Sequence, residues 1–283
     1  PFRFFDIIVI LGTSKAPIFD NRELVVTTPE DSAWVLVGSG PTRDSFRSYS
    51  IAGECDIAPD GTQLRFGDEL LLERSAGTVR VHAAVGESKI VLDLRLTDVV
   101  SHFAHLPGLY DHWSVLCEYS GTFTTGGATV TRNSLCTYEY ARAVNLPLPF
   151  LFFTYQILNI DERTQVLMVE VLGPVGVAVQ RTVYVRTIDG GGQTFSRGFA
   201  HTVTEHAAEP LVTPHGRRMR MPKRFSWAVD DDSGDELIRV DGIGNDDFAF
   251  GMAAGYAGSY DYTGRFRGEP IAGTGYIEWI DRR

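Results

Sequence analysis

The sequence predicts an all-β protein in which two antiparallel β-barrels, or curled sandwiches, follow one another along the chain. Short runs rich in β-branched and aromatic residues recur from end to end, and Gly, Pro, Asn and Asp separate them. No convincing long amphipathic helix interrupts these runs. A hairpin-like pattern also occurs twice, once near the middle of the chain and once near its end. Strands at this spacing are typical of antiparallel sandwiches and barrels.

The expected strands can be placed in chain order. Those before the first hairpin cover residues 7–11, 23–27, 33–37, 46–57, 63–73, 78–84 and 90–96. The first hairpin is expected at residues 111–142. The strands after it cover residues 150–159, 165–172, 177–188, 193–204, 224–229, 236–241, 248–266 and 274–280. Turn sequences rich in Asp, Pro and Gly lie between them.

The first hairpin has a turn that sets its register. Two runs rich in Val, Thr, Tyr, Trp and Phe flank residues 124–127, whose two glycines tolerate the positive φ of a tight turn. With these four residues as the loop, Phe123 lies opposite Ala128, and His112 lies opposite Glu139. A two-residue turn would shift the pairing by one or two residues. A shift of two keeps the pair within diagonal reach, whereas a shift of one puts the side chains on opposite faces.

The hairpin pattern is repeated. A Tyr-x-Gly-x-Phe motif begins at Tyr119 and again at Tyr262, and after a turn each copy continues into a strand with a carboxylate beside aromatic residues. That carboxylate is Glu139 in the first copy and Glu278 in the second. Such a repeat indicates a duplicated unit, each copy closing one half of the chain.

The repeat predicts two domains joined by a linker. Residues 144–149 contain two prolines, which remove backbone donors and favour an extended chain. The N-terminal barrel is therefore expected to cover residues 1–143, and the C-terminal barrel residues 150–283.

Composition narrows the class of protein. The formal charge of −10 and the pI near 5.2 argue against a nucleic-acid-binding chain, which normally needs a broad basic face. No apolar run reaches the roughly 18 residues of a membrane span, and the N-terminus has no signal-peptide pattern. Cys55, Cys117 and Cys136 form neither a disulfide framework nor a CxxC zinc site. We therefore expect a cytoplasmic protein without a metal.

The two closing hairpins resemble those of the tandem lipocalin-like proteins. This group includes the carotenoid hydratase hydroxyneurosporene synthase, attachment-type bacterial proteins and fungal lipocalin-like Diels-Alderases. The resemblance covers the layout of the whole chain, and its identifiable motifs span residues 110–142 and 260–281. It implies two lipocalin-like antiparallel β-barrels in tandem.

The resemblance also implies site residues. In the hydratase, one hairpin carries a His and an Asp that are thought to protonate an alkene, with a Tyr and a Trp nearby. In this sequence His112 takes the place of the His, Glu139 that of the Asp and Trp113 that of the Trp, while Tyr138 or Tyr140 takes that of the Tyr. The chain departs from the pattern because Glu replaces Asp and Trp directly follows His.

The chemistry of these residue types agrees with acid catalysis. A carboxylic acid desolvated in an apolar barrel has a raised pKa, so Glu139 is expected to remain protonated and to act as the proton donor. His112 would orient it, and the ring faces of Trp113 and Tyr140 would stabilise a carbocation by cation–π attraction. No metal or organic cofactor is needed.

Other aromatic residues of the hairpin, Tyr110 and Tyr119, are expected to bind the substrate. The opposing interpretation is that this face of the hairpin is simply solvated, because alternating polar residues are typical of the water side of a sheet. The polar residues that share the face are His112, Ser114, Glu118, Thr137 and Glu139.

Three further patterns carry weaker signals. His201 and Glu205 share a strand face, but their spacing is not that of a helical zinc motif, so a polar strand face is preferred. The acidic residues 230–236 lack the spacing of a calcium loop and predict a turn. One basic cluster offers weak contact with an anion or a membrane surface, or forms a solvated loop; it consists of Arg217, Arg218, Arg220, Lys223 and Arg224.

The sequence leaves three function classes. The preferred one is a cofactor-free hydratase, isomerase or cyclase that acts by acid catalysis on an apolar terpenoid, lipid or polyketide. The alternative is a non-catalytic carrier of an apolar small molecule, which needs only the aromatic-rich barrel. The third is a structural or stress-related protein with a filled core.

Overall fold

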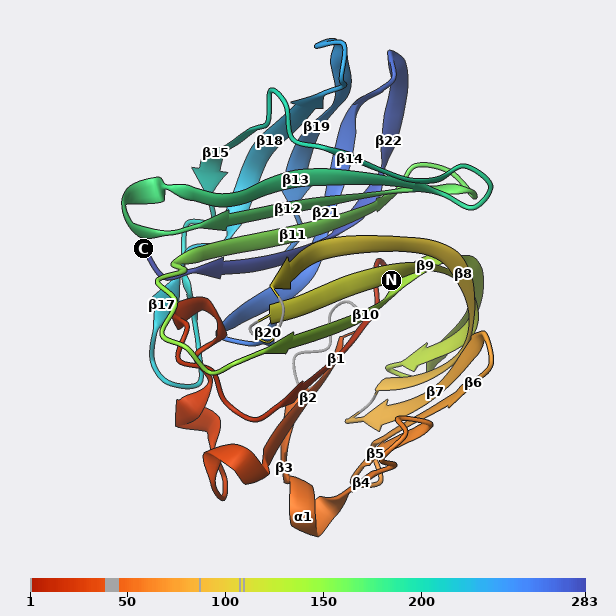
Figure 1. Ribbon diagram of the computed structural model, residues 1–283, viewed down its shortest axis with the longest axis vertical. Helices are drawn as coiled ribbons and strands as arrows, with labels where there is room; N and C mark the ends of the chain where they lie inside the picture. Colours follow the sequence, from red (N-terminus) through yellow and green to blue (C-terminus); the bar gives the residue numbers. More distant parts are fainter. Residues whose placement is uncertain (1, 39–45, 87, 107, 109) are drawn as a thin grey trace.

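The computed structural model of the protein describes residues 2–38, 46–86, 88–106, 108 and 110–283. These residues form antiparallel sheets with only short helical turns (Figure 1), so the predicted all-β fold is confirmed. No helix among them has the length and apolar character needed to cross a bilayer.

A three-stranded sheet in the order β1-β2-β3 lies near the N-terminus. Its strands are β1 (Asp6–Leu11), β2 (Ser32–Gly38) and β3 (Phe46–Ser50), and 3-10 helices occupy Pro17–Phe19, Arg22–Leu24 and Pro29–Asp31. Every residue of β2 is buried because the strand is covered on both faces. Val35 joins the core of one large sheet, and Leu36 packs with Ala257 of the other.

A seven-stranded sheet in the order β10-β9-β8-β7-β6-β5-β4 follows, and helix α1 (Ile51–Glu54) leads into it. Its strands are β4 (Cys55–Ile57), β5 (Gln63–Phe66), β6 (Leu70–Ser75), β7 (Thr78–Val85), β8 (Ser88–Leu106), β9 (Tyr110–Thr125) and β10 (Ala128–Ala143). Burial alternates strictly along β7, where Val79, Val81 and Ala83 point to the concave face. This period of two is typical of a sheet with one apolar face.

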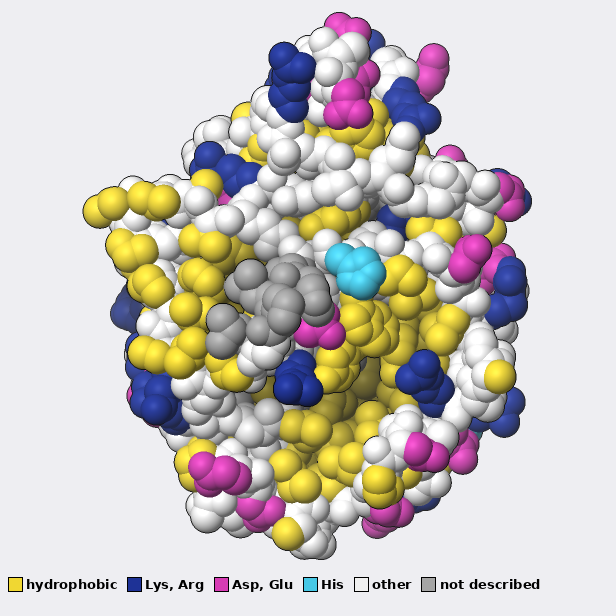
Figure 2. All heavy atoms as spheres, viewed as in Figure 1, with side chains coloured by type: hydrophobic (Ala, Val, Ile, Leu, Met, Phe, Trp, Pro, Cys, Tyr) yellow, Lys and Arg dark blue, Asp and Glu magenta, His cyan; other side chains and the backbone are white. Residues whose placement is uncertain are grey.

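The concave face of the seven-stranded sheet bounds a hollow. Figure 2 shows that hydrophobic side chains line its floor and that basic side chains lie near its mouth. By comparison with Figure 1, the hollow opens between the three-stranded sheet and strands β4–β7. Leu92 and Phe123 belong to the apolar cluster on this face. The curl of the sheet therefore leaves an apolar surface that is open to solvent.

The C-terminal part of the chain forms a ten-stranded sheet. The main path has the order β14-β13-β12-β11-β22-β21-β19-β18-β15, and β20 pairs with β21. The strands are β11 (Phe152–Asn159), β12 (Thr164–Leu172), β13 (Ala178–Thr187), β14 (Gly191–Phe195), β15 (Ala200–His206), β18 (Pro222–Asp230), β19 (Glu236–Gly244), β20 (Ala249–Met252), β21 (Gly255–Phe266) and β22 (Glu269–Asp281). A 3-10 helix covers Pro174–Gly176, and β16 (Leu211–Val212) pairs with β17 (Arg218–Met219).

The core of this sheet is aromatic. Trp227, Tyr260 and Trp279 are almost completely buried within its largest apolar cluster. The Trp227 indole N–H donates to Gln156 Oε1 at 2.9 Å, so the buried ring has a hydrogen-bond partner. The Trp279 indole N–H likewise donates to the backbone oxygen of Arg220 at 3.1 Å, whereas the buried Tyr260 hydroxyl has no hydrogen-bond partner among the described residues.

The register of the first hairpin differs from the expected one. Ala128 pairs with Thr125, not with Phe123, because the turn contains only Gly126 and Gly127. Both glycines have positive φ, 55° and 77°, as the tight two-residue hairpin turns require. The pairing is therefore shifted by two residues, and the expectation that His112 lies directly opposite Glu139 is wrong. An even shift keeps the faces unchanged.

The two repeated hairpins lie in different sheets. Strands β9 and β10 belong to the seven-stranded sheet, and β21 and β22 belong to the ten-stranded sheet. The second hairpin also has a two-residue turn, at Arg267 and Gly268, with φ of 52° and 85°. The predicted linker at residues 144–149 falls in the segment without strands between β10 and β11.

Replacing Gly264 of β21 by alanine should lower the free energy of unfolding by about 1–3 kcal/mol, as overpacking does. A Cβ atom at this position would come within 2.0 Å of the backbone oxygen of Arg239 on β19, and a backbone atom in a paired strand cannot move aside. Urea denaturation of the purified variant measures the loss. Gly192→Ala, in strand β14, is the control for general glycine effects, because its φ is not positive and the nearest contact of a Cβ atom there is an ordinary one, 3.7 Å from the Val99 side chain; an equal or larger loss in this control would contradict the clash.

Candidate active site at the junction of the two large sheets

Alternation along β9 and β10 sends His112 and Glu139 to the face that the ten-stranded sheet covers. His112 pairs with Ala141, and Glu139 pairs with Ser114, so His112 and Glu139 are diagonal neighbours. Ser114 is completely buried, while 19% of the His112 side chain and 27% of the Glu139 side chain are exposed. The face is polar but largely covered, unlike the water side of a sheet.

Glu139 lies between an imidazole and a phenol. His112 Nε2 is 3.6 Å from Glu139 Oε2, an ion-pair distance that is long for a hydrogen bond. Tyr155 of β11 donates its hydroxyl proton to Glu139 Oε1. On the other side of the ring, His112 Nδ1 lies 2.9 Å from the Tyr110 hydroxyl, and the Phe103 ring packs edge-on at 4.5 Å. Both ring nitrogens of His112 are thus positioned by neighbours.

The pKa of Glu139 is shifted in the opposite direction from the expected one. Burial raises it, but the His112 imidazole at ion-pair distance and the hydroxyl of Tyr155 outweigh burial, and the pKa is lowered. The charge of Arg186 acts in the same direction. Glu139 is therefore ionised at neutral pH, and the expectation of a protonated Glu139 is wrong because the carboxylate has partners that stabilise its charge.

Arg186 of β13 supports the site from the second sheet. Its side chain is completely buried; one terminal nitrogen donates to Ser114 Oγ at 2.8 Å, and the other donates to Gln165 Oε1. Burial lowers its pKa, and electrostatic interactions with Tyr155 and with the Glu139 carboxylate oppose this shift. Among the described residues the guanidinium has no carboxylate as a direct partner, so its charge acts on Glu139 from a distance.

A second carboxyl group near the junction has its pKa shifted in the opposite direction. Glu278 of β22 pairs with Tyr155 in the strand register and accepts a hydrogen bond from the Tyr276 hydroxyl at 2.9 Å. Burial raises its pKa well above the ordinary value, and the negative charge of Glu139 raises it further. The pKa of Glu278 is thus raised above its ordinary value, whereas that of Glu139 is lowered. Two carboxylates with pKa values pushed apart are a recurrent basis of acid–base catalysis.

A third acid, Asp6 of β1, lies beside this pair. Tyr276 Oη is 3.3 Å from Asp6 Oδ2, and burial raises the pKa of Asp6 to about 7 from the ordinary value of 3.8. The hydroxyl of Tyr276 has one proton and faces both Asp6 and Glu278, so it can donate to only one of them. The N-terminal strand therefore adds a proton-binding group to the junction.

The Asp6→Asn variant should be more stable than the wild type at pH 8, by about 2–4 kcal/mol, and equally stable near pH 4. In the wild type, unfolding releases the proton of Asp6 between its unfolded pKa near 3.8 and its folded pKa of about 7. Stability is therefore present below this window and is lost as the pH rises through it. Urea denaturation at several pH values measures the difference. A constant difference across the window would contradict the assignment.

The predicted aromatic residues lie on the other face of the hairpin. Tyr138 packs with Trp113, whose ring stacks on Tyr140 at 5.5 Å and 27°. Tyr138 and Tyr119 contact the apolar cluster of the concave face. The expected grouping of Tyr138 with His112 and Glu139 is wrong, because neighbours along a strand point to opposite faces. Among the predicted tyrosines, Tyr110 does reach the junction.

Sequence reasoning missed Tyr155 and Glu278 as parts of this site. The sequence around Tyr155 gave no sign of a functional role, because this residue lies in an apolar strand. It reaches Glu139 only because the ten-stranded sheet packs against the first hairpin. Glu278 did give one, since it occupies in the second hairpin the place that Glu139 occupies in the first. The repeat therefore brings its two equivalent carboxylates to one junction.

A second buried polar cluster lies inside the ten-stranded sheet. Glu170 Oε2 is 2.6 Å from His201 Nδ1, and Arg181 Nε donates to Glu170 Oε1 at 2.9 Å. The rings of Phe152 and Trp279 surround the imidazole. The sequence signal was a single Glu within an apolar strand, residues 164–172.

Glu205, which the sequence paired with His201, instead forms an exposed ion pair with Arg224 at 3.1 Å. The polar strand face preferred for this segment is therefore right for Glu205 but wrong for His201, whose side chain is buried against aromatic rings. Among the described residues, no group of three or more His, Cys, Asp or Glu side chains is arranged to hold a metal ion. The basic cluster is partly neutralised, since Arg217 pairs with Glu23, and Lys223 with Asp246.

The acidic turn behaves as expected from its composition. Asp231 Oδ1 accepts backbone hydrogen bonds from Ser233, Gly234 and Asp235, which is an ordinary way for Asp to stabilise a turn. The predicted acidic turn is thus confirmed at these residues.

The sheets have a lipocalin-like fold, and solved structures of other proteins share this arrangement. A protein of Nitrosomonas europaea assigned as AttH superposes with a TM-score of 0.62 at 12% identity, over 89% of this chain and 81% of that one. Kievitone hydratase of Nectria haematococca superposes with a TM-score of 0.62 at 12% identity, over 88% and 79%. At this identity the likeness shows the fold alone.

The sequence itself identifies the family. Residues 8–283 match the model of DUF6670, a family of unknown function, and the chain belongs to that family. No protein of curated function matches the sequence significantly.

Proposed function

We propose that the protein is a proton-transfer enzyme of the hydratase, isomerase or cyclase type, with its catalytic centre at Glu139, His112 and Glu278. The observation that carries this proposal is the placement beside Tyr155 of two carboxyl groups whose pKa values are shifted in opposite directions. A neutral acid and an ionised base in one site supply both halves of a proton-transfer reaction. Both come from the chain itself, so the proposed chemistry is cofactor-free.

Hydration of an alkene illustrates the chemistry. The neutral carboxyl of Glu278 gives its proton to one alkene carbon, and the ionised Glu139 stabilises the positive charge that develops on the other. Water adds to that carbon and passes a proton to Glu139, which His112 holds in position. The net reaction adds one water molecule, and the proton returns from Glu139 to Glu278 by way of Tyr155 or solvent. Without water, loss of a proton to Glu139 gives an isomer.

Apolar surroundings support an apolar substrate class such as terpenoids, lipids or polyketides. Phe103 packs against His112 and also against Tyr155, with ring centres 4.5 Å and 5.8 Å apart. Val99 and Leu116 continue the apolar surface of the junction. Low polarity around the carboxylates strengthens their electrostatic effects on a developing cation.

An isotope experiment tests the proposal. The protein is incubated with a panel of isoprenoid alkenes in ¹⁸O-labelled water, and mass spectrometry detects labelled alcohols. The wild type should form a labelled product, and Glu278→Gln should form it at least about 100-fold more slowly, because glutamine has no transferable proton. Equal rates for the wild type and the variant would refute the role of Glu278.

The hollow of the first sheet favours the alternative function, a carrier of an apolar small molecule. Its concave surface is lined by hydrophobic side chains and is open to solvent (Figure 2), which catalysis at the junction does not require. Trp113, Tyr119 and Tyr138 share this face rather than the junction. Two results together would favour the carrier function. The protein would bind an apolar molecule in the hollow, and the Glu139→Gln variant would convert every tested substrate at the rate of the wild type.

A further inference from the structure

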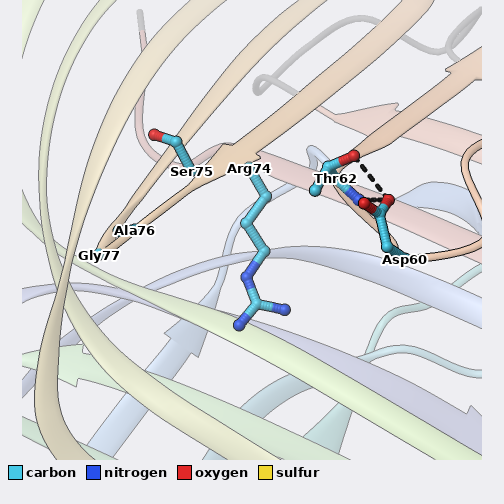
Figure 3. A pocket seen from close by; sticks show the side chains of 6 residues that line it. All are labelled: Asp60, Thr62, Arg74, Ser75, Ala76 and Gly77. Carbon is cyan, nitrogen blue, oxygen red and sulfur yellow. Dashed lines mark hydrogen bonds between the residues drawn. The ribbon is translucent and has the colours of Figure 1, made fainter.

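The mouth of the hollow carries an arginine on the inward face of β6. Leu70 and Leu72 of this strand belong to the apolar cluster, and Arg74 is the next residue on the same face. Figure 3 shows the Arg74 side chain extending away from the turn that holds Asp60 and Thr62, with its guanidinium clear of both. Arg74 also lines a surface cavity of about 360 Å³ next to that turn. Its charge therefore faces the hollow from the rim.

A second arginine faces the hollow from the opposite edge of the sheet. Arg132 of β10 pairs with Gly121 of β9, so it lies on the concave face together with Tyr119 and Phe123. Gly121 has no side chain that could cover it. Arg132 is exposed, and it stands beside the apolar cluster without being part of it.

The curl of the sheet turns the two arginines toward the same space. The strand registers connect Arg74 across β7, β8 and β9 to β10, through Val79, Leu94, Tyr119 and Ser134. Burial raises the pKa of Tyr138 on β10, and the positive charge of Arg74 offsets part of that rise. Arg74 and Arg132 thus lie on the same concave face, on strands at opposite sides of the curled sheet.

Neither guanidinium has an ion-pair or hydrogen-bond partner within the part of the chain that the structure describes. On the convex face of the same sheet, by contrast, Arg80 pairs with Asp93 at 2.8 Å, and Arg95 pairs with Glu118. The chain as a whole has 36 acidic and 26 basic residues, so acidic partners are abundant. Two unneutralised arginines at the mouth of an apolar hollow leave positive charge available for a ligand.

We propose that the hollow binds an elongated apolar molecule with a single carboxylate, whose anionic end lies at Arg74 and Arg132. The planar guanidinium matches a carboxylate through paired N–H donors, and the apolar wall accommodates the hydrocarbon body. A long-chain fatty acid has this chemistry. The inference names the ligand class of the carrier alternative, and it is independent of catalysis at the junction.

The fluorescence of Trp113 can report whether a ligand occupies the hollow. Its ring lies on the concave face against Tyr138 and Tyr140, whereas Trp34, Trp227 and Trp279 are almost completely buried. A bromine atom quenches tryptophan fluorescence only at close contact. A brominated fatty acid in the hollow should therefore quench Trp113, and the Trp113→Phe variant should lose that quenching.

Binding experiments with the full chain test the proposal. Titration calorimetry compares hexadecanoic acid with hexadecanol, which has the same chain and no charge. The acid should bind the wild type about tenfold more tightly than the alcohol. The double variant Arg74→Gln and Arg132→Gln should lose that preference and bind both equally. Arg80→Gln, on the convex face, is the matched control and should retain it.

The results of these binding experiments distinguish the anion site from the carrier function and from catalysis at the junction. Equal binding of acid and alcohol by the wild type overturns the anion site but leaves an apolar carrier intact. Quenching that persists in Trp113→Phe places the ligand elsewhere and also overturns the inference. Absence of binding to both probes overturns the inference and the carrier alternative together, and none of these results bears on the isotope experiment at the junction.

Discussion

Glu139→Gln should lower the rate of turnover by about 10²–10⁴-fold on any alkene that the wild type converts. Glutamine keeps the shape of the side chain and can still accept the Tyr155 hydrogen bond, but it carries no negative charge and cannot take a proton from water. The substitution also removes the negative charge that lies 3.6 Å from His112 Nε2 in the wild type. Steady-state kinetics measures the fall, which should appear in kcat more than in KM because desolvation of an apolar substrate dominates its binding.

Glu118→Gln is the matched control for this experiment. Glu118 lies on the same face of β9 and forms an exposed ion pair with Arg95. Its replacement should leave turnover within about twofold of the wild type, since exposed pairs contribute little. A Glu139→Gln enzyme with wild-type kcat and an unchanged melting temperature would rule out Glu139 as the base. His112→Ala should cost less than Glu139→Gln if the imidazole only positions the carboxylate.

Glu170→Ala should lower the free energy of unfolding by about 3–5 kcal/mol, the largest stability effect expected here. Only 3% of the Glu170 side chain is exposed, and its removal leaves the equally buried His201 and the Arg181 guanidinium without their shared partner. Buried polar groups that lose a partner incur the full cost of desolvation. Urea denaturation at pH 7 measures the difference. Glu205→Ala should cost less than about 1 kcal/mol, because the Glu205 pair with Arg224 is exposed.

The stability difference between the wild type and Glu170→Ala should depend on pH. Burial raises the pKa of Glu170, but His201 and Arg181 outweigh it, so the folded pKa lies below the ordinary value of 4.5. The contribution of Glu170 to stability is therefore present above the unfolded pKa and is lost as the pH falls through the folded pKa. The difference between wild type and Glu170→Ala should shrink below about pH 4. A difference that grows in acid would contradict the assignment.

The hairpin of β9 and β10 shows how far sequence reasoning reaches. A period of two along each strand places His112 and Glu139 on one face whether the turn has two residues or four, because the two registers differ by an even number. The same period separates Tyr138 from Glu139. The expected grouping of these two residues ignored that rule, so the error was avoidable without a structure.

Local preferences and strand alternation were enough to predict the all-β class, both closing hairpins, and the common face of His112 and Glu139. Whether that face meets water or protein depended on the packing of the two large sheets. The answer depends on Tyr155 and Arg186, which reach the face through packing of a second sheet. The tertiary structure also decided the charge of Glu139, since a pKa is set by burial and by neighbouring charges that chain distance does not reveal.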